Sequence, residues 1–229
     1  MEYSFKLNNN WYGSKEDCGF KTSLYHRINV TLKPGITVLV GCNGAGKTTF
    51  LKQLKRKLEK EKTPFLLYDN LKDGGSNAIN KAGFFEDFSF IATAIQSSEG
   101  ENINMNVGNF AREVGNYVYK KLKPTDKVMF LLVDAVDSGM SIDHIYDLKE
   151  NFFRFVSEDL KKSGVDLYVV VSANSYEMAR EENCLDVYNA KYVKFNDYEE
   201  YRKFILHSRG IKDKRYGHLT KLEEHNDKR

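Results

Sequence analysis

The N-terminal part of the chain changes from an alternating to a continuous hydrophobic pattern. Apolar and polar residues alternate within 2–12 and 23–33, as in Ser4-Phe5-Lys6-Leu7. A period of two is typical of strands with one buried face, and we expect these segments to form an antiparallel N-terminal β edge. A turn signal at 33–35 leads into the apolar run 36–40, which predicts a strand covered on both faces.

Helical and strand patterns alternate through the rest of the chain. An amphipathic helix follows the strand at 36–40, with Leu51, Leu54 and Leu58 on its apolar stripe. Residues 70–104 are interpreted as loop with some helix around 81–96. Further strands are predicted at 65–68, 128–133 and 167–171. The core positions of two more helices are Val107, Phe110, Ala111, Val114, Val118 and Leu122, and then Ile145, Leu148, Phe152, Phe155 and Val156. This alternation predicts an α/β fold in which helices cover both faces of a mostly parallel sheet.

The composition fits one globular domain with a basic end. The 229 residues are 41% hydrophobic and 29% charged, and the net charge of +3 demands no nucleic-acid partner. From residue 201 onward, nine Lys or Arg stand against four Asp or Glu. We therefore predict a single domain over 1–207 and a basic, solvated C-terminal tail over 208–229.

Three features point to a cytoplasmic protein. The three cysteines have no metal-ligand spacing, which suits a reducing compartment. The chain starts with a polar, strand-like segment in place of a signal peptide. No apolar run approaches the ~20 residues that a membrane-spanning helix needs, so no membrane insertion is expected.

The most specific motif is the glycine-rich loop Gly41-Cys42-Asn43-Gly44-Ala45-Gly46-Lys47-Thr48, which matches G-x-x-x-x-G-K-[ST] between a buried strand and an amphipathic helix. The glycines let backbone N–H groups approach phosphates, and the following helix adds the positive end of its dipole. Lys47 is expected to bind the β- and γ-phosphates and Thr48 a Mg²⁺ ion. The motif predicts ATP and Mg²⁺ as cofactors. The predicted contacts are Asn43, Gly44, Ala45, Gly46, Lys47, Thr48 and Thr49.

A second carboxylate is expected close to this loop. Asp134 ends the buried run 128–133, and ligands gather at the C-terminal ends of strands in open α/β sheets. A P-loop nucleotide needs such a carboxylate as its second magnesium ligand. We therefore predict a metal site formed by Thr48 and Asp134.

The extended loop sequence, with Asn43 and Thr49, resembles the G-x-N-G-x-G-K-T-T form of ATP-binding-cassette ATPases and of their RecF/SMC-like, AAA family relatives. Residues 134–141 are similar to the second motif and D-loop of that superfamily. Ser98-Glu99-Gly100-Glu101 resembles its signature, and Asn174 stands at the position of its H-loop histidine. The resemblance spans roughly residues 20–195. It implies a P-loop NTPase fold of the cassette type.

The chain departs from the pattern of these ATPases at several catalytic positions. Ala135 replaces their catalytic Glu, and an alanine methyl group cannot activate water. Asn174 replaces the histidine, Ser97 and Glu99 depart from the signature, and Asp69-Asn70 stands where a Gln is expected. We expect Lys47, Asp134 and, as a substitute base, Asp137 to carry slow or impaired hydrolysis.

The resemblance also implies a dimer. In these ATPases the signature of one subunit completes the nucleotide site of another, so Ser98 and Gly100 would face the γ-phosphate across an ATP-dependent homodimer. Only 51 positions separate Lys47 from Ser98, which leaves no room for coiled-coil arms and makes a transport subunit an unfavoured interpretation.

Other functions remain open on the sequence alone. By analogy, an ATP-driven switch would act in DNA metabolism, mobile-element biology or defence. A P-loop kinase for a small molecule is an alternative, although residues 72–104 contain no arginine for a lid. A nucleotide sensor that recruits a protein partner without turnover is another.

Two binding roles are also left open. The basic tail could bind DNA, with the nearby tyrosines at 192, 198 and 201 stacking on bases, although packing in the fold is favoured for them. The resemblance implies an aromatic residue against adenine, with Trp11, Phe20 and Tyr25 as candidates.

Overall fold

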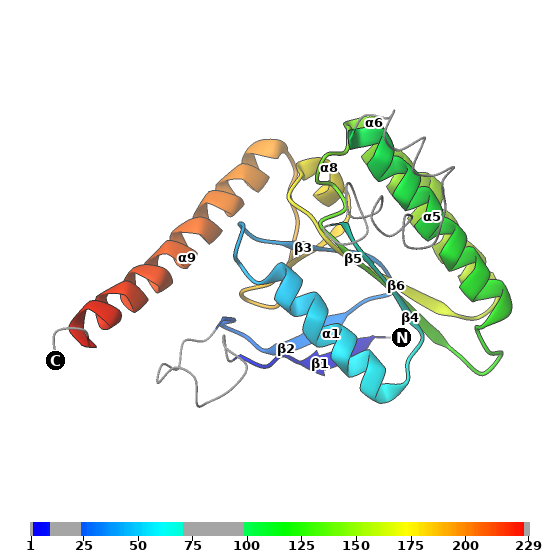
Figure 1. Cartoon of the computed structure of the whole chain (residues 1–229), viewed down its shortest axis with the longest axis horizontal. Coiled ribbons are helices and arrows are strands. Elements are labelled where there is room, and N and C mark those ends of the chain that lie inside the picture. Colours follow the sequence, from blue (N-terminus) through cyan, green and yellow to red (C-terminus); the bar gives the residue numbers. More distant parts are fainter. Residues whose placement is uncertain (1, 10–23, 71–98, 227–229) are drawn as a thin grey trace, which may run out of the picture.

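The computed structural model describes residues 2–9, 24–70 and 99–226, which form a six-stranded sheet with helices on both faces (Figure 1). The strand order is β4-β5-β6-β3-β7-β8, and only the β7–β8 pair is antiparallel. The strands are β3 (Gly35–Val40), β4 (Phe65–Asp69), β5 (Val128–Asp134), β6 (Asp166–Ser172), β7 (Asn183–Asp186) and β8 (Lys191–Val193). The predicted α/β fold is confirmed.

Two apolar cores fill the space on either side of this sheet. One lies under helix α1 (Lys47–Glu61), whose buried residues include the predicted leucine stripe. The other lies under α5 (Glu99–Lys120) and a continuous helical segment made of α6 (Ile142–Asp147), the π-helical η1 (Leu148–Arg154) and α7 (Phe155–Lys162). The predicted helices at 107–122 and 145–156 are thus confirmed, whereas the helix expected around 81–96 lies outside the described residues.

The N-terminal strands β1 (Tyr3–Lys6) and β2 (Asn29–Leu32) pair antiparallel, as predicted. They form a small sheet of their own and do not extend the edge of the main sheet. The Tyr3 ring packs on Phe130 of β5 at 4.8 Å between centroids, and Phe5 packs on Phe50 of α1 at 5.3 Å. The small sheet therefore covers the same face as α1.

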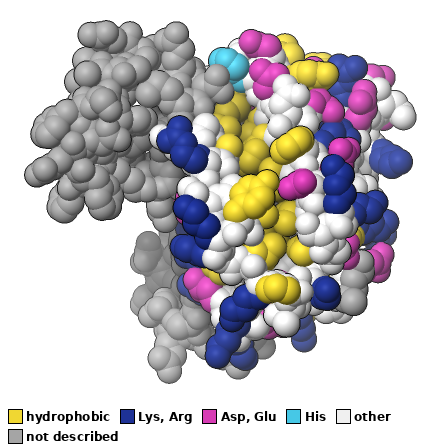
Figure 2. Space-filling model, turned by 90° about the vertical axis from the view of Figure 1, so that its right-hand side faces the viewer, with side chains coloured by type: hydrophobic (Ala, Val, Ile, Leu, Met, Phe, Trp, Pro, Cys, Tyr) yellow, Lys and Arg dark blue, Asp and Glu magenta, His cyan; other side chains and the backbone are white. Residues whose placement is uncertain are grey.

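One predicted core position is wrong. Ile145 and Leu148 are buried as expected, but Phe155 is 67% exposed. The π-helical η1 carries more residues per turn than an α-helix, so positions beyond it are rotated away from the stripe that a 3.6-residue period predicts. Figure 2 looks onto the side of the molecule where α5 and α6–α7 lie, and it shows hydrophobic side chains gathered among Lys and Arg.

Two more helices are the short α8 (Tyr176–Ala179), between β6 and β7, and the long α9 (Tyr198–Asn226), after β8. Helix α9 packs with Phe204 and Ile205 against the core and then extends outward from the rest of the molecule (Figure 1). The expected boundary between domain and tail at 207/208 falls inside this helix. No helix in the described part of the chain combines the length and the apolar character that crossing a membrane requires.

Candidate nucleotide-binding site

The glycine-rich loop connects the end of β3 to the start of α1, and two of its glycines are required by geometry. At Gly46, φ is 102°, and an added Cβ would lie 3.1 Å from the Leu24 side chain. At Gly41, an added Cβ would lie 2.9 Å from the Cβ of Ala45, closer than carbon atoms normally approach. The loop thus folds tightly between β3 and α1.

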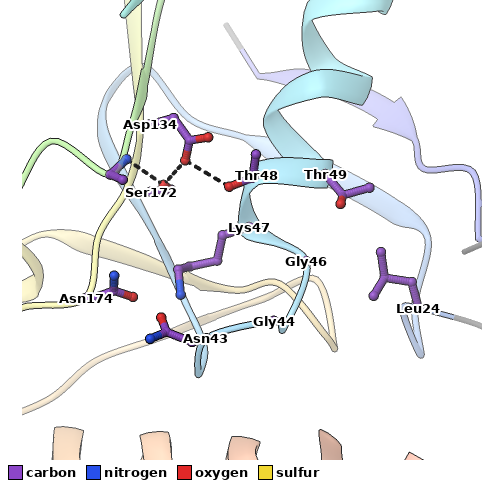
Figure 3. A pocket seen from close by; sticks show the side chains of 11 residues that line it. Leu24, Asn43, Gly44, Gly46, Lys47, Thr48, Thr49, Asp134, Ser172 and Asn174 are labelled. Carbon is purple, nitrogen blue, oxygen red and sulfur yellow. Dashed lines mark hydrogen bonds between the residues drawn. The ribbon is translucent and has the colours of Figure 1, made fainter. Parts of the chain in front are cut away.

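A pocket of about 300 Å³ opens beside this loop (Figure 3). Its lining includes most of the predicted nucleotide contacts, among them Lys47 and Thr48 from α1, together with Asp134 from β5. Ala45 is buried within the loop and its N–H donates to the carbonyl of Cys42 at 3.0 Å. The lining residues are Leu24, Asn43, Gly44, Gly46, Lys47, Thr48, Thr49, Asp134, Ala135, Ser172 and Asn174.

Lys47 is folded back against the loop and is only 8% exposed. Its Nζ donates hydrogen bonds to the carbonyl oxygens of Gly41 at 2.7 Å and Cys42 at 3.3 Å. Burial lowers the pKa of Lys47, while Cys42 and the nearby carboxylates act in the opposite direction. A buried ammonium whose hydrogen-bond acceptors are neutral carbonyls attracts an anion such as a phosphate strongly.

Thr48 and Asp134 meet as predicted, on neighbouring sides of the pocket (Figure 3). The Thr48 Oγ1 donates to the Asp134 Oδ1 at 3.2 Å, and the Ser172 hydroxyl donates to the same oxygen. Strand β6 lies between β3 and β5, which places Ser172, at its end, directly opposite Asp134 in the register. Three oxygen-bearing side chains thus converge on one point at the C-terminal edge of the sheet.

These oxygens fit a magnesium ion. Mg²⁺ prefers oxygen ligands and takes one or two carboxylates from the protein, with phosphates and water supplying the rest. The described residues hold no cluster of three or more His, Cys, Asp or Glu of the kind that would form an all-protein metal cage. A single buried Asp134 next to a threonine hydroxyl therefore suits a metal shared with a bound nucleotide.

Ala135 also lines the pocket, and its backbone is in the left-handed region with φ of 54°. Several hydrogen bonds hold it there. Its N–H donates to Ser172 Oγ at 3.0 Å, and its carbonyl accepts from the Asn70 side chain at 3.1 Å. The Asn70 side chain also donates to the carbonyl of Ser138 at 3.2 Å, so it fixes the turn that follows β5.

Asp137 is buried and connects two loops of the site. Its Oδ2 accepts the backbone N–H groups of Asn174 at 2.8 Å and Ser175 at 2.5 Å. Its Oδ1 is buried and has no hydrogen-bond partner among the described residues. The carboxylate therefore holds the loop after β6, and the Asn174 side chain of that loop lines the pocket.

The remaining predicted contacts are the signature-like residues and the aromatic candidates for stacking on adenine. Ser98, Trp11 and Phe20 lie outside the described residues, and Gly100 lies in the first turn of α5. Tyr25 is 0% exposed and donates its hydroxyl to the Gly46 carbonyl at 3.0 Å, so it cannot stack on adenine.

The tyrosines near the C-terminus differ from one another. Tyr201 is buried, so its predicted packing in the fold is confirmed. Tyr192 accepts the Lys33 N–H at 3.2 Å, whereas Tyr198 is 60% exposed.

Sequence reasoning missed Leu24 and Ser172, and it named Asn70 only as a departure at the position of the expected Gln. Ser172 was within reach of the rule that ligand-binding groups lie at the C-terminal ends of parallel strands, because it ends β6. Asn70 directly follows β4 and carries the same signal, whereas Leu24 carries none, since its contact with the site depends on segments far apart in the sequence.

Comparison with known families gives a match over the region that contains this pocket. A family model described as an AAA domain matches residues 30–173, more than half of the chain. The matched region runs from β2 to just beyond β6 and so contains the glycine-rich loop, Asp134 and Ser172. A search of curated proteins found no significant match.

Proposed function

The chain belongs to the AAA domain family of P-loop ATPases, and we propose that it is an ATP-dependent dimerisation switch with slow or impaired hydrolysis. The observation that carries the proposal is a pocket that brings together the expected phosphate and metal ligands and has an alanine at the position expected for the catalytic Glu. Lys47, Thr48 and Asp134 converge there, while Ala135 lines the same wall.

In this proposal the triphosphate is held by the backbone N–H groups at the start of α1 and by the ammonium of Lys47. Thr48 and Asp134 would hold Mg²⁺, which neutralises charge on the phosphates when it is bound. The side-chain amides of Asn43 and Asn174, which line the pocket, would donate hydrogen bonds to the phosphate end of the nucleotide. The cofactors are therefore ATP and Mg²⁺.

Slow hydrolysis follows from the groups that face the pocket. Ala135 has no proton acceptor in its side chain, and losing a general base costs roughly 10²–10⁴ in rate. Asp137 remains the substitute base of this proposal, but one of its oxygens already accepts two backbone N–H groups. Its other oxygen, Oδ1, is buried without a hydrogen-bond partner among the described residues, and Asp137 does not line the pocket, so a base at this position requires the turn after β5 to shift toward the nucleotide.

Two observations support dimerisation. Helix α5, which begins at the signature-like residues, packs on the face of the sheet opposite to α1, so its start is suited to the site of another subunit. Helix α6 follows the turn at 137–141 and exposes Ile142 (66%) and Tyr146 (63%). Large apolar side chains exposed next to a nucleotide-site turn fit a surface that a partner covers.

A non-hydrolysing nucleotide sensor that recruits a partner is the second candidate, and the alanine at 135 favours it equally. The two functions differ only in turnover. The buried free thiols of Cys42 and Cys184 fit a cytoplasmic protein. A setting in DNA metabolism, mobile-element biology or defence rests on analogy alone.

Mass in solution, measured with and without ATP and Mg²⁺ alongside phosphate release, tests the proposal. We expect a monomer that becomes a dimer with ATP and Mg²⁺ and that releases phosphate slowly. Lys47→Ala should remain monomeric under both conditions. A wild-type chain that binds ATP and stays monomeric would contradict the switch, and phosphate transfer that needs an acceptor molecule would favour a kinase.

A further inference from the structure

Helix α9 crosses the outside of the nucleotide-binding loop and contacts it at two points. The backbone N–H of Cys42 donates to Ser208 Oγ at 3.1 Å, and Lys212 Nζ donates to the carbonyl of Asn43 at 3.2 Å. Ser208 and Lys212 are four residues apart and therefore lie on one face of the helix. The Lys212 stem also approaches Gly44, where an added Cβ would lie 3.4 Å from its Cδ.

The same helix also contacts the loop after β6, which lines the pocket. Tyr201 is 4% exposed, and its hydroxyl donates to the carbonyl of Asn174 at 2.9 Å. The Asn174 side chain lines the pocket, and the backbone N–H of Asn174 donates a hydrogen bond to the Asp137 carboxylate. Helix α9 thus bridges the glycine-rich loop and the loop after β6, the two segments between which the phosphates would lie.

The contacts with the loop are separate from the packing that anchors the helix. Phe204 and Ile205 pack against the apolar cores, which accounts for the attachment of α9. Ser208 and Lys212 lie beyond them, and the Lys212 side chain is still 23% exposed. Besides Asn43, Lys212 has only a long ion-pair contact with Asp213, at 3.9 Å, among the described residues. Its ammonium is therefore directed at the loop backbone.

We propose that Ser208 and Lys212 are positioning residues for nucleotide binding, which hold residues 41–44 in the shape that accepts a triphosphate. This inference rests on the proposed function, because it assumes that the loop binds ATP. A loop that is already ordered loses less conformational entropy when its ligand binds, so the affinity is higher. Lys212 also adds positive charge beside a loop that receives a polyanion. Because linkage is reciprocal, bound nucleotide strengthens the contacts of α9.

Calorimetric titration of the full chain with ATP and Mg²⁺ tests this role. Ser208→Ala and Lys212→Met should each raise the Kd roughly three- to tenfold, the effect expected for one lost hydrogen bond, and the double variant should raise it further. Lys212→Arg should restore most of the affinity. Lys203→Met, which removes an exposed lysine earlier on the same helix, should bind like the wild type.

Two further readouts separate positioning from general stability. Without nucleotide, the unfolding temperatures of Lys212→Met and Lys203→Met should agree, because neither side chain belongs to the core. Amide hydrogen exchange across residues 41–46 should be faster in the double variant than in the wild type. A double variant that binds ATP within twofold of the wild type would overturn the inference and leave the proposed function intact. A folded wild-type chain that binds no ATP would overturn both.

Discussion

Ala135 lines the nucleotide pocket immediately after Asp134, and its side chain has no proton acceptor. Ala135→Glu places a carboxylate there. The backbone of Ala135 already has a φ of 54°, in the left-handed region, which costs any residue with a Cβ about 1–2 kcal/mol. Glutamate has the same cost as alanine there, so the substitution adds no backbone strain. The wild-type backbone conformation at residue 135 can therefore accommodate a glutamate, whose carboxylate can activate water.

The size of the effect follows from the missing group. A positioned general base accelerates hydrolysis by roughly 10²–10⁴, which corresponds to about 3–5 kcal/mol of activation free energy. Because Asp134 is adjacent, the added negative charge is expected to weaken nucleotide binding in the absence of Mg²⁺. With Mg²⁺ the two carboxylates are partly neutralised, and the gain in rate should dominate.

The assay is steady-state phosphate release at saturating ATP and Mg²⁺, with the Kd measured in parallel. Ala135→Gln is the matched control, because it has the same size and backbone as the glutamate variant but no charge. We expect a rise in turnover for glutamate alone. Equal rates for the wild type and for both variants would refute the assignment of residue 135 as the position of the missing base.

Three further predictions follow from the structure. Lys47→Met should abolish ATP-induced thermal stabilisation. It should leave the unfolding temperature without nucleotide unchanged or higher, because burial lowers the pKa of Lys47 in the folded state, and the charged lysine therefore opposes folding at pH values below that lowered pKa. Ser172→Ala should cost about 0.5–1.5 kcal/mol of unfolding free energy by denaturant titration, since Asp134 and the Ala135 N–H each lose one hydrogen bond but keep another, whereas the exposed Ser4→Ala should cost less than about 0.5 kcal/mol. Tyr146→Asp should prevent the ATP-dependent dimer by sedimentation, and Tyr119→Asp, at a still more exposed tyrosine on α5, should not; equal behaviour of the two variants would count against α6 as part of the interface.

The parts of the molecule that the sequence predicted are those encoded by residues close together in the chain. The glycine-rich loop, with Lys47 and Thr48, is one contiguous motif, and its place between a buried strand and an amphipathic helix identifies it. Asp134 was predictable because it ends an uninterrupted apolar run, and the register of parallel strands brings such ends together.

The parts that escaped prediction depend on packing between distant segments. The place of Ser172 at the end of β6 was a usable signal, but its contact with Asp134 depends on the pairing of β5 with β6, which local patterns do not contain. The exposure of Phe155 follows from a π-helical turn, for which the sequence gives no periodic signal. The contacts of α9 with the loop escaped for the same reason, since they join residues more than 160 positions apart.

The central claim is that the glycine-rich loop holds a triphosphate whose metal ion is shared by Thr48 and Asp134. Calorimetric titration of ATP, with and without Mg²⁺, into the wild type and into Asp134→Asn tests it most directly. We predict one nucleotide per chain, tighter binding with Mg²⁺ in the wild type, and loss of the Mg²⁺-dependent gain in Asp134→Asn, with Mg²⁺-free binding retained. No heat of binding to folded wild-type protein, or the same Mg²⁺ effect in both chains, would contradict the claim.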